Sequence, residues 1–107
     1  MFSSKLLSEF CKELSTLLAS GISIVRALEI IAEEEGLPAN ARGVYLSVLA
    51  DLRKGTSLAE AMETKKCFPE LMLGMIRSGE GSGNIDAVME RLSLHYEREN
   101  RLKNQVR

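Results

Sequence analysis

The sequence predicts an all-α protein, a compact antiparallel bundle of six helices in which residues 1–107 form a single domain. Three observations lead to this fold class. Apolar residues recur three and four positions apart, the period of a helix, through six segments. Residues typical of helix caps and helix ends flank these segments. No run alternates between apolar and polar residues as a half-buried strand does. We therefore expect a helical far-UV circular dichroism spectrum without a strand component.

The first two helices each end close to a glycine. An apolar stripe over residues 4–19 predicts the first helix, and Gly21 ends it. Ser23 can cap a second helix that runs to about Glu35. The segment Gly36-Leu37-Pro38 then prevents that helix from continuing.

The middle of the chain contains a long helix and a short one. The third helix covers residues 39–54, and Gly55 ends it. The segment Ser57-Leu58-Ala59-Glu60 has the pattern of a capping box, in which a serine and a glutamate three residues later satisfy free N–H groups. It predicts a short fourth helix to about Thr64.

The last two helices are joined by a glycine-rich segment. Phe68-Pro69 places a proline in the first turn of the fifth helix. Apolar residues surround this helix, so we expect it to be the most buried of the six. Gly74 costs the helix about 1 kcal/mol relative to alanine, and we expect a neighbouring helix to approach closely there. Asn84 caps a sixth helix that reaches the chain end.

Composition and charge exclude several classes of protein. Hydrophobic residues make up 45% of the 107 residues and charged residues 27%, which suits a globular fold. The 14 basic and 15 acidic residues give a net charge of −1, whereas nucleic-acid binders usually show a basic excess. Two Cys and one His offer little to a disulfide framework, a metal centre or a catalytic base. No membrane span or signal peptide is recognisable, so we expect a soluble, cytoplasmic chain.

The segment Gly79-Glu80-Gly81-Ser82-Gly83-Asn84 is the most unusual part of the sequence. A glycine-rich turn before a helix can bind phosphate, but this one lacks the spacing and the lysine of a P-loop. We interpret Gly79, Gly81 and Gly83 as structural glycines of a tight turn, and expect the last two to adopt angles that other residues tolerate poorly. We expect the Glu80 carboxylate to accept hydrogen bonds from the first N–H groups of the sixth helix.

Three carboxylates near the start of the sixth helix form a candidate metal site. Asp86 and Glu90 are four residues apart and share a helix face, with Glu80 nearby. Such a cluster can hold a hard cation such as calcium, but acids are also favourable near a helix N-terminus without any metal. Of the three, we take Glu90 as the better candidate ligand. The sequence shows no apolar pocket that would raise one carboxyl pKa above its partner, as hydrolysis requires.

The remaining reactive or charged side chains are scattered. We interpret Cys11 as a small core residue, Cys67 as a loop residue and His95 as a surface residue of the sixth helix. Two charged patches are open to two interpretations each. The acidic patch is either a solvated face or a contact for a basic partner, and the basic patch either a solvated face or a contact for anionic headgroups. The patches comprise Glu29, Glu33, Glu34 and Glu35, and Arg98, Arg101, Lys103 and Arg107.

Several motifs together resemble the type II secretion system protein F family. Residues 10–22 resemble its opening of an aromatic residue, Leu, Thr-Leu-Leu and a small-Gly-Ile turn. Residues 55–61 resemble its Gly-x-Ser-Leu-x-x-Ala motif. Residues 79–86 resemble Gly-Glu-x-Ser-Gly-x-Leu-Asp, its most distinctive block. Family proteins are larger, with two such domains and typically three membrane helices, and Ser23 stands where they usually have proline. We interpret the chain as one cytoplasmic domain of a larger membrane protein, resembling the first copy.

The resemblance implies a structural role without catalysis. Family members are platform proteins of the bacterial inner membrane, at the base of type II secretion or type IV pilus machines. The implied function is a scaffold on the cytoplasmic face that links the assembly ATPase to pilin or pseudopilin assembly. Its implied partners are a second copy, the ATPase and other platform proteins, and it reaches the membrane only through segments outside this chain. The resemblance implies no required cofactor. Some family members bind calcium at a dimer interface, and the resemblance therefore implies a candidate calcium site at Glu90 and its neighbours.

Two other function classes remain open at this point. The basic chain end and the glycine-rich segment would also suit a small helical regulator that binds nucleic acid or a nucleotide, and a steep salt dependence would identify it. The other class is a hydrolase that uses Glu80, Asp86 and Glu90. It would be supported only if the wild-type chain shows hydrolytic activity and the Glu80→Gln substitution abolishes it. In each case one small bundle cannot bury all of a 45% hydrophobic composition, so we expect a dimer at high micromolar concentration, paired through an apolar stripe.

Overall fold

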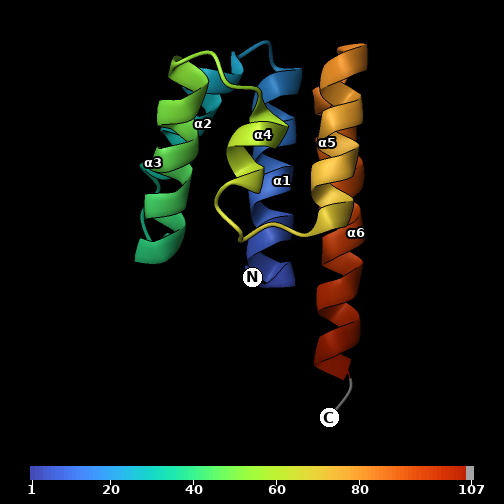
Figure 1. The fold of residues 1–107 in the computed structure, drawn as a ribbon. Coiled ribbons are helices and arrows are strands. Elements are labelled where there is room, and N and C mark those ends of the chain that lie inside the picture. Colours follow the sequence, from blue (N-terminus) through green and yellow to red (C-terminus); the bar gives the residue numbers. More distant parts are fainter. Residues whose placement is uncertain (106–107) are drawn as a thin grey trace.

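The computed structural model describes residues 1–105 and confirms the all-α prediction, because this part of the chain forms six helices and no strand (Figure 1). The helices are α1 (Ser4–Ala19), α2 (Ile24–Ala32), α3 (Ala39–Arg53), α4 (Leu58–Glu63), α5 (Glu70–Ser82) and α6 (Ile85–Gln105). The largest boundary errors are at the ends of two helices. Helix α5 continues to Ser82, through the segment expected to be a turn, and α2 ends at Ala32 rather than near Glu35. The N–H groups of Glu33 and Glu34 bond to carbonyls three residues back, which tightens the last turn and ends the helix early.

Serine side chains cap three of the helices. The hydroxyls of Ser3, Ser23 and Ser57 accept the third free N–H group of α1, α2 and α4 respectively. Proline takes a different position from the expected one in α5, because Pro69 is the extended residue before the helix rather than a member of its first turn. Its fixed φ fits this extended position as well as it fits a helical one. Local capping signals therefore account for the starts of three of the six helices.

The helices pack as neighbours in chain order, and the first helix also packs against the last. In Figure 1, α2 and α3 lie on one side, α1 and α4 in the middle, and α5 and α6 on the other side. The longest helix, α6, returns along α1, and this is the most extensive helix pair in the molecule. Besides Phe10, the two helices contribute seven buried apolar side chains to the hydrophobic core. They are Leu7, Cys11 and Leu14, and Val88, Met89, Leu92 and Tyr96.

Aromatic side chains from four parts of the chain meet at one end of the core. Phe10 of α1 stacks on Tyr45 of α3, with ring centroids 4.7 Å apart. Phe2 makes edge contacts with Tyr45 and with Phe68, at 6.1 and 5.4 Å. Such contacts add about 0.5–1.5 kcal/mol each to the burial of apolar area. The cluster therefore fixes α3 and the α4–α5 connection against α1.

The expectation that α5 is the most buried helix is wrong. Leu71 is 49% exposed and Met75 is only half-buried, because one face of α5 points to solvent. Gly74 lies on that open face, where an added Cβ would have no atom within 4 Å, so no neighbouring helix approaches it. The close approach that we expected at Gly74 occurs at Gly79 instead. Apolar residues around a helix thus did not identify which face packs.

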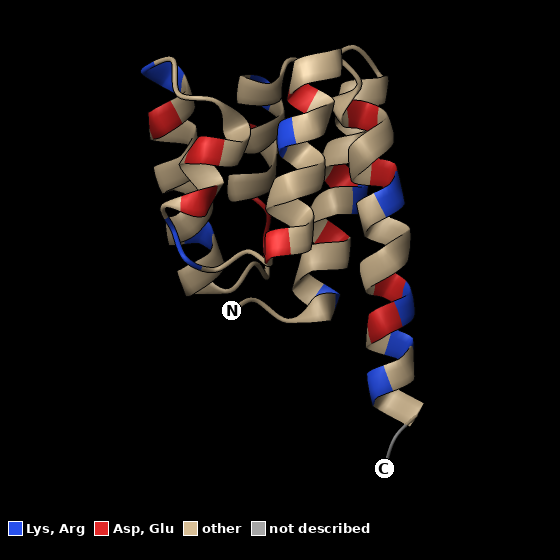
Figure 2. Cartoon of the chain, turned by 45° about the vertical axis from the view of Figure 1, so that its right-hand side comes forward, with Lys and Arg blue, Asp and Glu red and all other residues tan. Residues whose placement is uncertain are grey.

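The last turns of α6 project beyond the rest of the bundle (Figures 1 and 2). This end of the helix carries Arg98, Arg101 and Lys103, together with Leu102, which is 55% exposed. Arg107, the fourth member of the expected basic patch, lies outside the described residues. No helix in the part of the chain that the structure describes is both long and apolar enough to cross a membrane.

Candidate interaction site

The glycine-rich segment is mostly helical rather than a loop. Helix α5 continues through Ser82, so Gly79 and Gly81 belong to it, and the chain turns only at Gly83 and Asn84. Gly83 has the left-handed φ of +75° that we expected, and its N–H donates to the carbonyl of Gly79. The same expectation is wrong for Gly81, which has an ordinary helical φ. The glycines of this segment therefore have different roles.

Replacing Gly83 with valine should lower the free energy of unfolding by about 1–3 kcal/mol, because a β-branched residue is strained at φ +75°. Gly81→Ala is the matched control. Its site is helical and open, so alanine should leave stability unchanged or raise it by up to about 1 kcal/mol. Urea denaturation of the two variants decides the matter, and a Gly83→Val variant as stable as the parent would contradict the role of the turn.

Glu80 caps a helix, but not the one we expected. Its carboxylate accepts the N–H groups of Leu58 and Ala59, at 2.7 and 3.0 Å, at the start of α4 rather than α6. The Ser57 hydroxyl accepts the third N–H of this helix, from Glu60. The first three free N–H groups of α4 are thus all satisfied, two of them by a charged acceptor from another helix. The two motifs at residues 55–61 and 79–86 therefore meet in space.

The three carboxylates of the candidate metal site are not brought together within one chain. Glu80 is engaged with α4, and Asp86 is exposed at the start of α6, where its carbonyl accepts the Ser15 hydroxyl. Glu90 lines a groove between α1 and α6 together with Lys12. Within residues 1–105 no group of three or more His, Cys, Asp or Glu side chains could hold a metal ion. A calcium site at Glu90 would need ligands from a second copy, and it stays a prediction.

The cysteines and the histidine lie where we expected them. Cys11 is buried in the core, and burial raises the pKa of its thiol to about 12, so it is inert at neutral pH. Cys67 is half-buried in the segment before α5. His95 is on the surface of α6, with its ring 3.9 Å from the Glu99 carboxylate. Glu99 also accepts the Ser4 hydroxyl at 2.5 Å, and this bond is the main cause that lowers the pKa of its carboxyl group.

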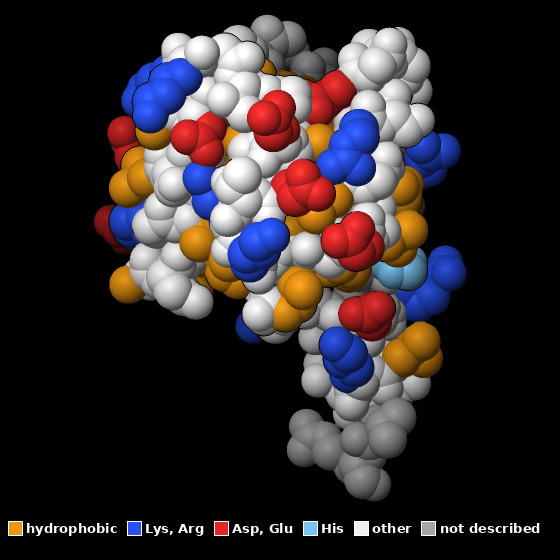
Figure 3. Space-filling view, in the orientation of Figure 1, with side chains coloured by type: hydrophobic (Ala, Val, Ile, Leu, Met, Phe, Trp, Pro, Cys, Tyr) orange, Lys and Arg blue, Asp and Glu red, His pale blue; other side chains and the backbone are white. Residues whose placement is uncertain are grey.

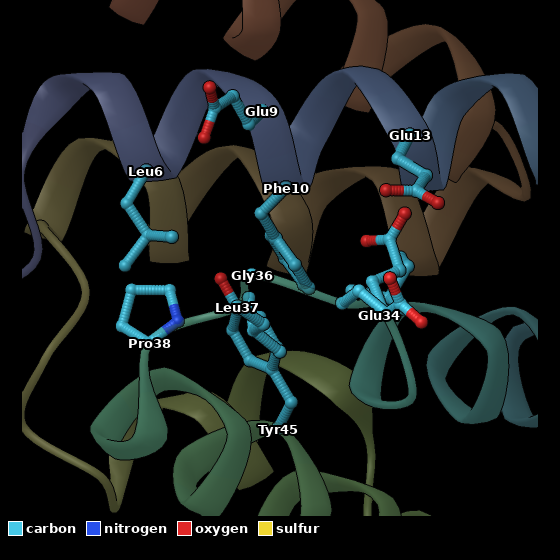
Figure 4. A pocket seen from close by; sticks show the side chains of 11 residues that line it. Leu6, Glu9, Phe10, Glu13, Glu34, Gly36, Leu37, Pro38 and Tyr45 are labelled. Atoms are coloured by element: carbon cyan, nitrogen blue, oxygen red, sulfur yellow. The ribbon is translucent and has the colours of Figure 1, made fainter.

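The acidic patch expected on the second helix is divided in the structure. Glu29 pairs with Arg26 and Arg53, and Glu33 is exposed. Glu34 instead turns toward α1, where its carboxyl group faces that of Glu13 (Figure 4). Glu13 was not a candidate in the sequence, because it is one of only two acids in α1, and neither belongs to a charged run or motif.

A groove of about 330 Å³ lies between α1 and the segment that joins α2 to α3 (Figure 4). We call it the acidic groove. Its carboxylates are those of Glu9, Glu13, Glu34 and Glu35, and its apolar walls include Leu6, Phe10, Leu37 and Pro38. Tyr45 also lines it, and the hydroxyl of this residue is buried with no hydrogen-bond partner among the described residues.

Protons stabilise the folded state at this groove. Burial, together with the neighbouring carboxyl group of Glu34, raises the pKa of Glu13 from 4.5 to about 7. The folded chain then binds more protons than the unfolded chain between these values, so stability should fall as pH rises from about 4.5 to about 7.

Glu13→Gln should remove this dependence and make the protein more stable than the parent at pH 8, with little difference at pH 4. We expect the free energy of unfolding to increase by about 1 kcal/mol at pH 8. A pKa shift corresponds to about 1.4 kcal/mol per unit, and the expected effect is smaller than this conversion gives because solvent reaches and screens the pair. Thermal unfolding of both proteins across this pH range measures it. Parallel pH profiles for parent and variant would contradict the coupling.

A surface view shows no broad patch of one charge. On the face drawn in Figure 3, acidic and basic side chains are interspersed over the bundle. Besides Met1, four large apolar side chains among the described residues are about half exposed or more, on α3, α5 and α6. They are Leu46, Leu71, Leu94 and Leu102. A second, mostly apolar hollow of about 290 Å³ lies beside Glu80 and Leu58, where the two motifs meet. These features are typical of a protein that binds other proteins.

Comparison with known proteins identifies the family. The sequence pattern of the type II secretion system (T2SS) protein F family matches residues 10–107. The chain belongs to this protein F family. The match covers both motifs that meet at Glu80, so the resemblance seen in the sequence is confirmed.

Relatives from two kinds of machine share this domain. The type IV pilus assembly protein PilC of Thermus thermophilus is 31% identical over 101 residues, 94% of this chain and 25% of the relative. Type II secretion system protein F of Aeromonas hydrophila is 36% identical over 94 residues, covering 86% of this chain and 24% of the relative. The protein F of Pseudomonas aeruginosa is 36% identical over 92 residues, covering 84% and 22%. The chain thus spans about a quarter of the length of these relatives.

Proposed function

We propose that the chain is a cytoplasmic scaffold domain of the inner-membrane platform protein of a type IV pilus or type II secretion machine. The observation that carries this proposal is the family match over residues 10–107. The names of the relatives, pilus assembly protein and secretion system protein F, support a place in such a machine. In this role the domain links the assembly ATPase to pilin or pseudopilin assembly by binding, and it catalyses no reaction.

The geometry supports a binding role over a catalytic one. The carboxylate of Glu80, one of the three acids that a hydrolase would use, is occupied by two backbone N–H groups of α4. Its partners among the candidate acids, Asp86 and Glu90, are exposed on α6. Exposed leucines and apolar hollows are what the surface offers instead.

The test is direct binding of the purified 107-residue chain to the assembly ATPase of the same organism, measured by isothermal titration calorimetry. We expect saturable binding. Single aspartate substitutions at Leu46, Leu71, Leu94 and Leu102 should preserve the fold, because these side chains are exposed, and one of them should weaken binding about tenfold or more. If the folded chain binds duplex DNA with a steep salt dependence and does not bind the ATPase, the domain is a nucleic-acid-binding regulator and not a scaffold.

We further propose that the domain pairs with a second copy, and that calcium strengthens the pair through Glu90. Glu90 and the exposed Leu94 are four residues apart on α6 and share a face. A second copy on this face would bury Leu94 and bring two Glu90 carboxylates near one interface.

Glu90→Gln should leave the unfolding free energy of the monomer within about 0.5 kcal/mol, because Glu90 is exposed. The substitution should weaken pairing in calcium, since the amide keeps the size and loses the charge. In a chelator it should not weaken pairing, because the two carboxylates repel each other without a cation. Sedimentation equilibrium of parent and variant, with calcium and with chelator, provides the measurement. If calcium does not change the pairing of the parent, Glu90 has no cation role, and a strict monomer at millimolar concentration would remove the dimer as well.

A further inference from the structure

The acidic groove is not explained by the platform role, and the inference drawn from it holds whether or not the domain binds the ATPase. We propose that this groove binds an arginine side chain of a partner protein, with its guanidinium group held by the carboxylates of Glu13 and Glu34. The partner is a protein segment that presents this arginine, inserted between α1 and the segment that joins α2 to α3.

The charges of the groove lack a counterpart within the described chain. Four carboxylates line it and no Lys, Arg or His does. None of the ion pairs formed within residues 1–105 involves Glu9, Glu13, Glu34 or Glu35. Arg42 packs against the same segment, but its guanidinium donates to the backbone carbonyls at positions 32 and 34. Uncompensated carboxylates at a partly buried site favour a cation from outside.

Tyr45 gives a second, independent indication of a ligand. The side chain is 1% exposed, its ring stacks on Phe10, and its hydroxyl has no hydrogen-bond partner among the described residues. In Figure 4 the hydroxyl end of Tyr45 extends toward Leu37, under the apolar wall of the groove. A buried hydroxyl without a partner costs about 1–3 kcal/mol, and such groups are rare in native proteins. A donor that enters between α1 and Leu37 would satisfy it.

The shape and chemistry of the groove favour arginine over other cations. A guanidinium group is planar and carries five N–H donors, enough for two carboxylates and a hydroxyl, whereas a lysine ammonium has three donors and is more strongly hydrated. The apolar walls at Leu6, Leu37 and Pro38 can cover the hydrocarbon part of the side chain. The volume of about 330 Å³ is at the small end of the range for ligand pockets, as expected for one side chain.

Binding should release a proton. The groups that face Glu13 are Glu9 on its own helix, Glu34 and Glu35 from the adjoining segment, and Tyr45 from α3, with Arg42 behind that segment. Burial and the neighbouring Glu34 raise the pKa of Glu13 to about 7, so the Glu13 carboxyl group is protonated at lower pH. A guanidinium group needs the ionised pair and must displace this proton. Affinity should therefore rise as the pH rises from 6 to 8.

The experiment titrates the isotope-labelled 107-residue chain with N-acetyl-arginine amide and follows backbone amide resonances by NMR. We expect saturable shifts confined to the groove, at Phe10, Gly36 and Leu37. The dissociation constant should be about tenfold lower at pH 8 than at pH 6, and several-fold lower than that for N-acetyl-lysine amide.

Four variants distinguish the groove from general charge attraction. Glu13→Gln and Glu34→Gln should each raise the dissociation constant about tenfold, because each removes one carboxylate that holds the guanidinium group. Tyr45→Phe keeps the ring stack on Phe10 and should raise it about threefold. Glu33→Gln is the matched control, since it removes the same charge one residue away on an exposed side chain, and it should change affinity less than twofold. The dispersion of the amide spectrum shows that each variant is folded.

Several results would overturn the proposal. Shifts that spread over all acidic surfaces, equal affinity for the arginine and lysine compounds, or equal effects of Glu33→Gln and Glu34→Gln would each show ordinary charge attraction. An affinity that does not change with pH would show that the Glu13–Glu34 pair is not the site. Groove resonances that move with protein concentration alone, and cease to move in Glu34→Gln, would assign the groove to a second copy instead of another protein.

Discussion

Replacing Gly79 with valine should lower the free energy of unfolding by about 3 kcal/mol, a large part of the total for a domain of this size. A Cβ atom at this position would lie 2.8 Å from Cγ2 and 3.3 Å from Cβ of Val88, and 3.2 Å from Cδ1 of Ile85. Val88 is buried and branched at Cβ, so it cannot turn away as a long flexible side chain would. Either α5 and α6 must separate or the new side chain must adopt a strained rotamer.

The control separates this contact from the effect of glycine on helix stability. Gly74 is in the same helix on its open face, so Gly74→Ala should raise stability by up to about 1 kcal/mol through helix propensity. Gly79→Ala gains the same propensity but must lose more than it gains to the contact with Val88. Urea denaturation of all three variants measures the difference. If Gly79→Ala were as stabilising as Gly74→Ala, α5 and α6 would not be in close contact at this point.

Replacing Glu80 with alanine should destabilise the protein by about 3 kcal/mol. The substitution leaves the N–H groups of Leu58 and Ala59 without acceptors at the start of a six-residue helix. Both residues are buried, so water cannot easily replace the carboxylate. Glu80→Gln keeps one acceptor oxygen and turns an NH₂ group toward the other donor, and should cost about 2 kcal/mol.

Two further measurements make the role of Glu80 specific. Ser57→Ala removes the third acceptor of the same helix start and should cost about 1 kcal/mol, less than Glu80→Ala, because its bond is exposed and uncharged. Hydrogen exchange of the α4 amides should accelerate in the Glu80 variants before the rest of the bundle is affected. Unchanged protection of α4 in a destabilised Glu80→Ala protein would place the loss elsewhere in the fold.

Structural features that depend on residues close in the sequence could be predicted, whereas contacts between residues distant in the sequence could not. Ser23 and Ser57 cap the expected helices because a cap and the N–H group it accepts are three residues apart. Glu80 was expected to cap α6, since the sequence cannot show that the start of α4 lies closer to its carboxylate. The close helix contact was expected at Gly74 and occurs at Gly79, because the sequence cannot show which glycine lies against Val88.

The acidic groove also depends on contacts between residues that are distant in the sequence. The sequence singled out Glu34 as part of an acidic patch, but it offered no signal for Glu13, which is distant in the chain and faces it only after folding. Tyr45 is a buried aromatic residue of α3, and its unpaired hydroxyl became visible only with its neighbours in place. Helix existence and family could thus be predicted from the sequence, whereas the pairing of side chains between helices could not.

The projecting end of α6 has a mechanical consequence. A helix of 21 residues is a stiff rod about 30 Å long, and most of it is fixed along α1. At the edge of the bundle, Glu99 and Lys103 both bond to the Ser4 hydroxyl at the beginning of α1. A force applied to the free end of the rod would therefore reach the first turn of α1 before it reached α3 or α4. We expect α1 and α6 to tilt together under such a force, so that a displacement at the end of α6 also moves the beginning of α1.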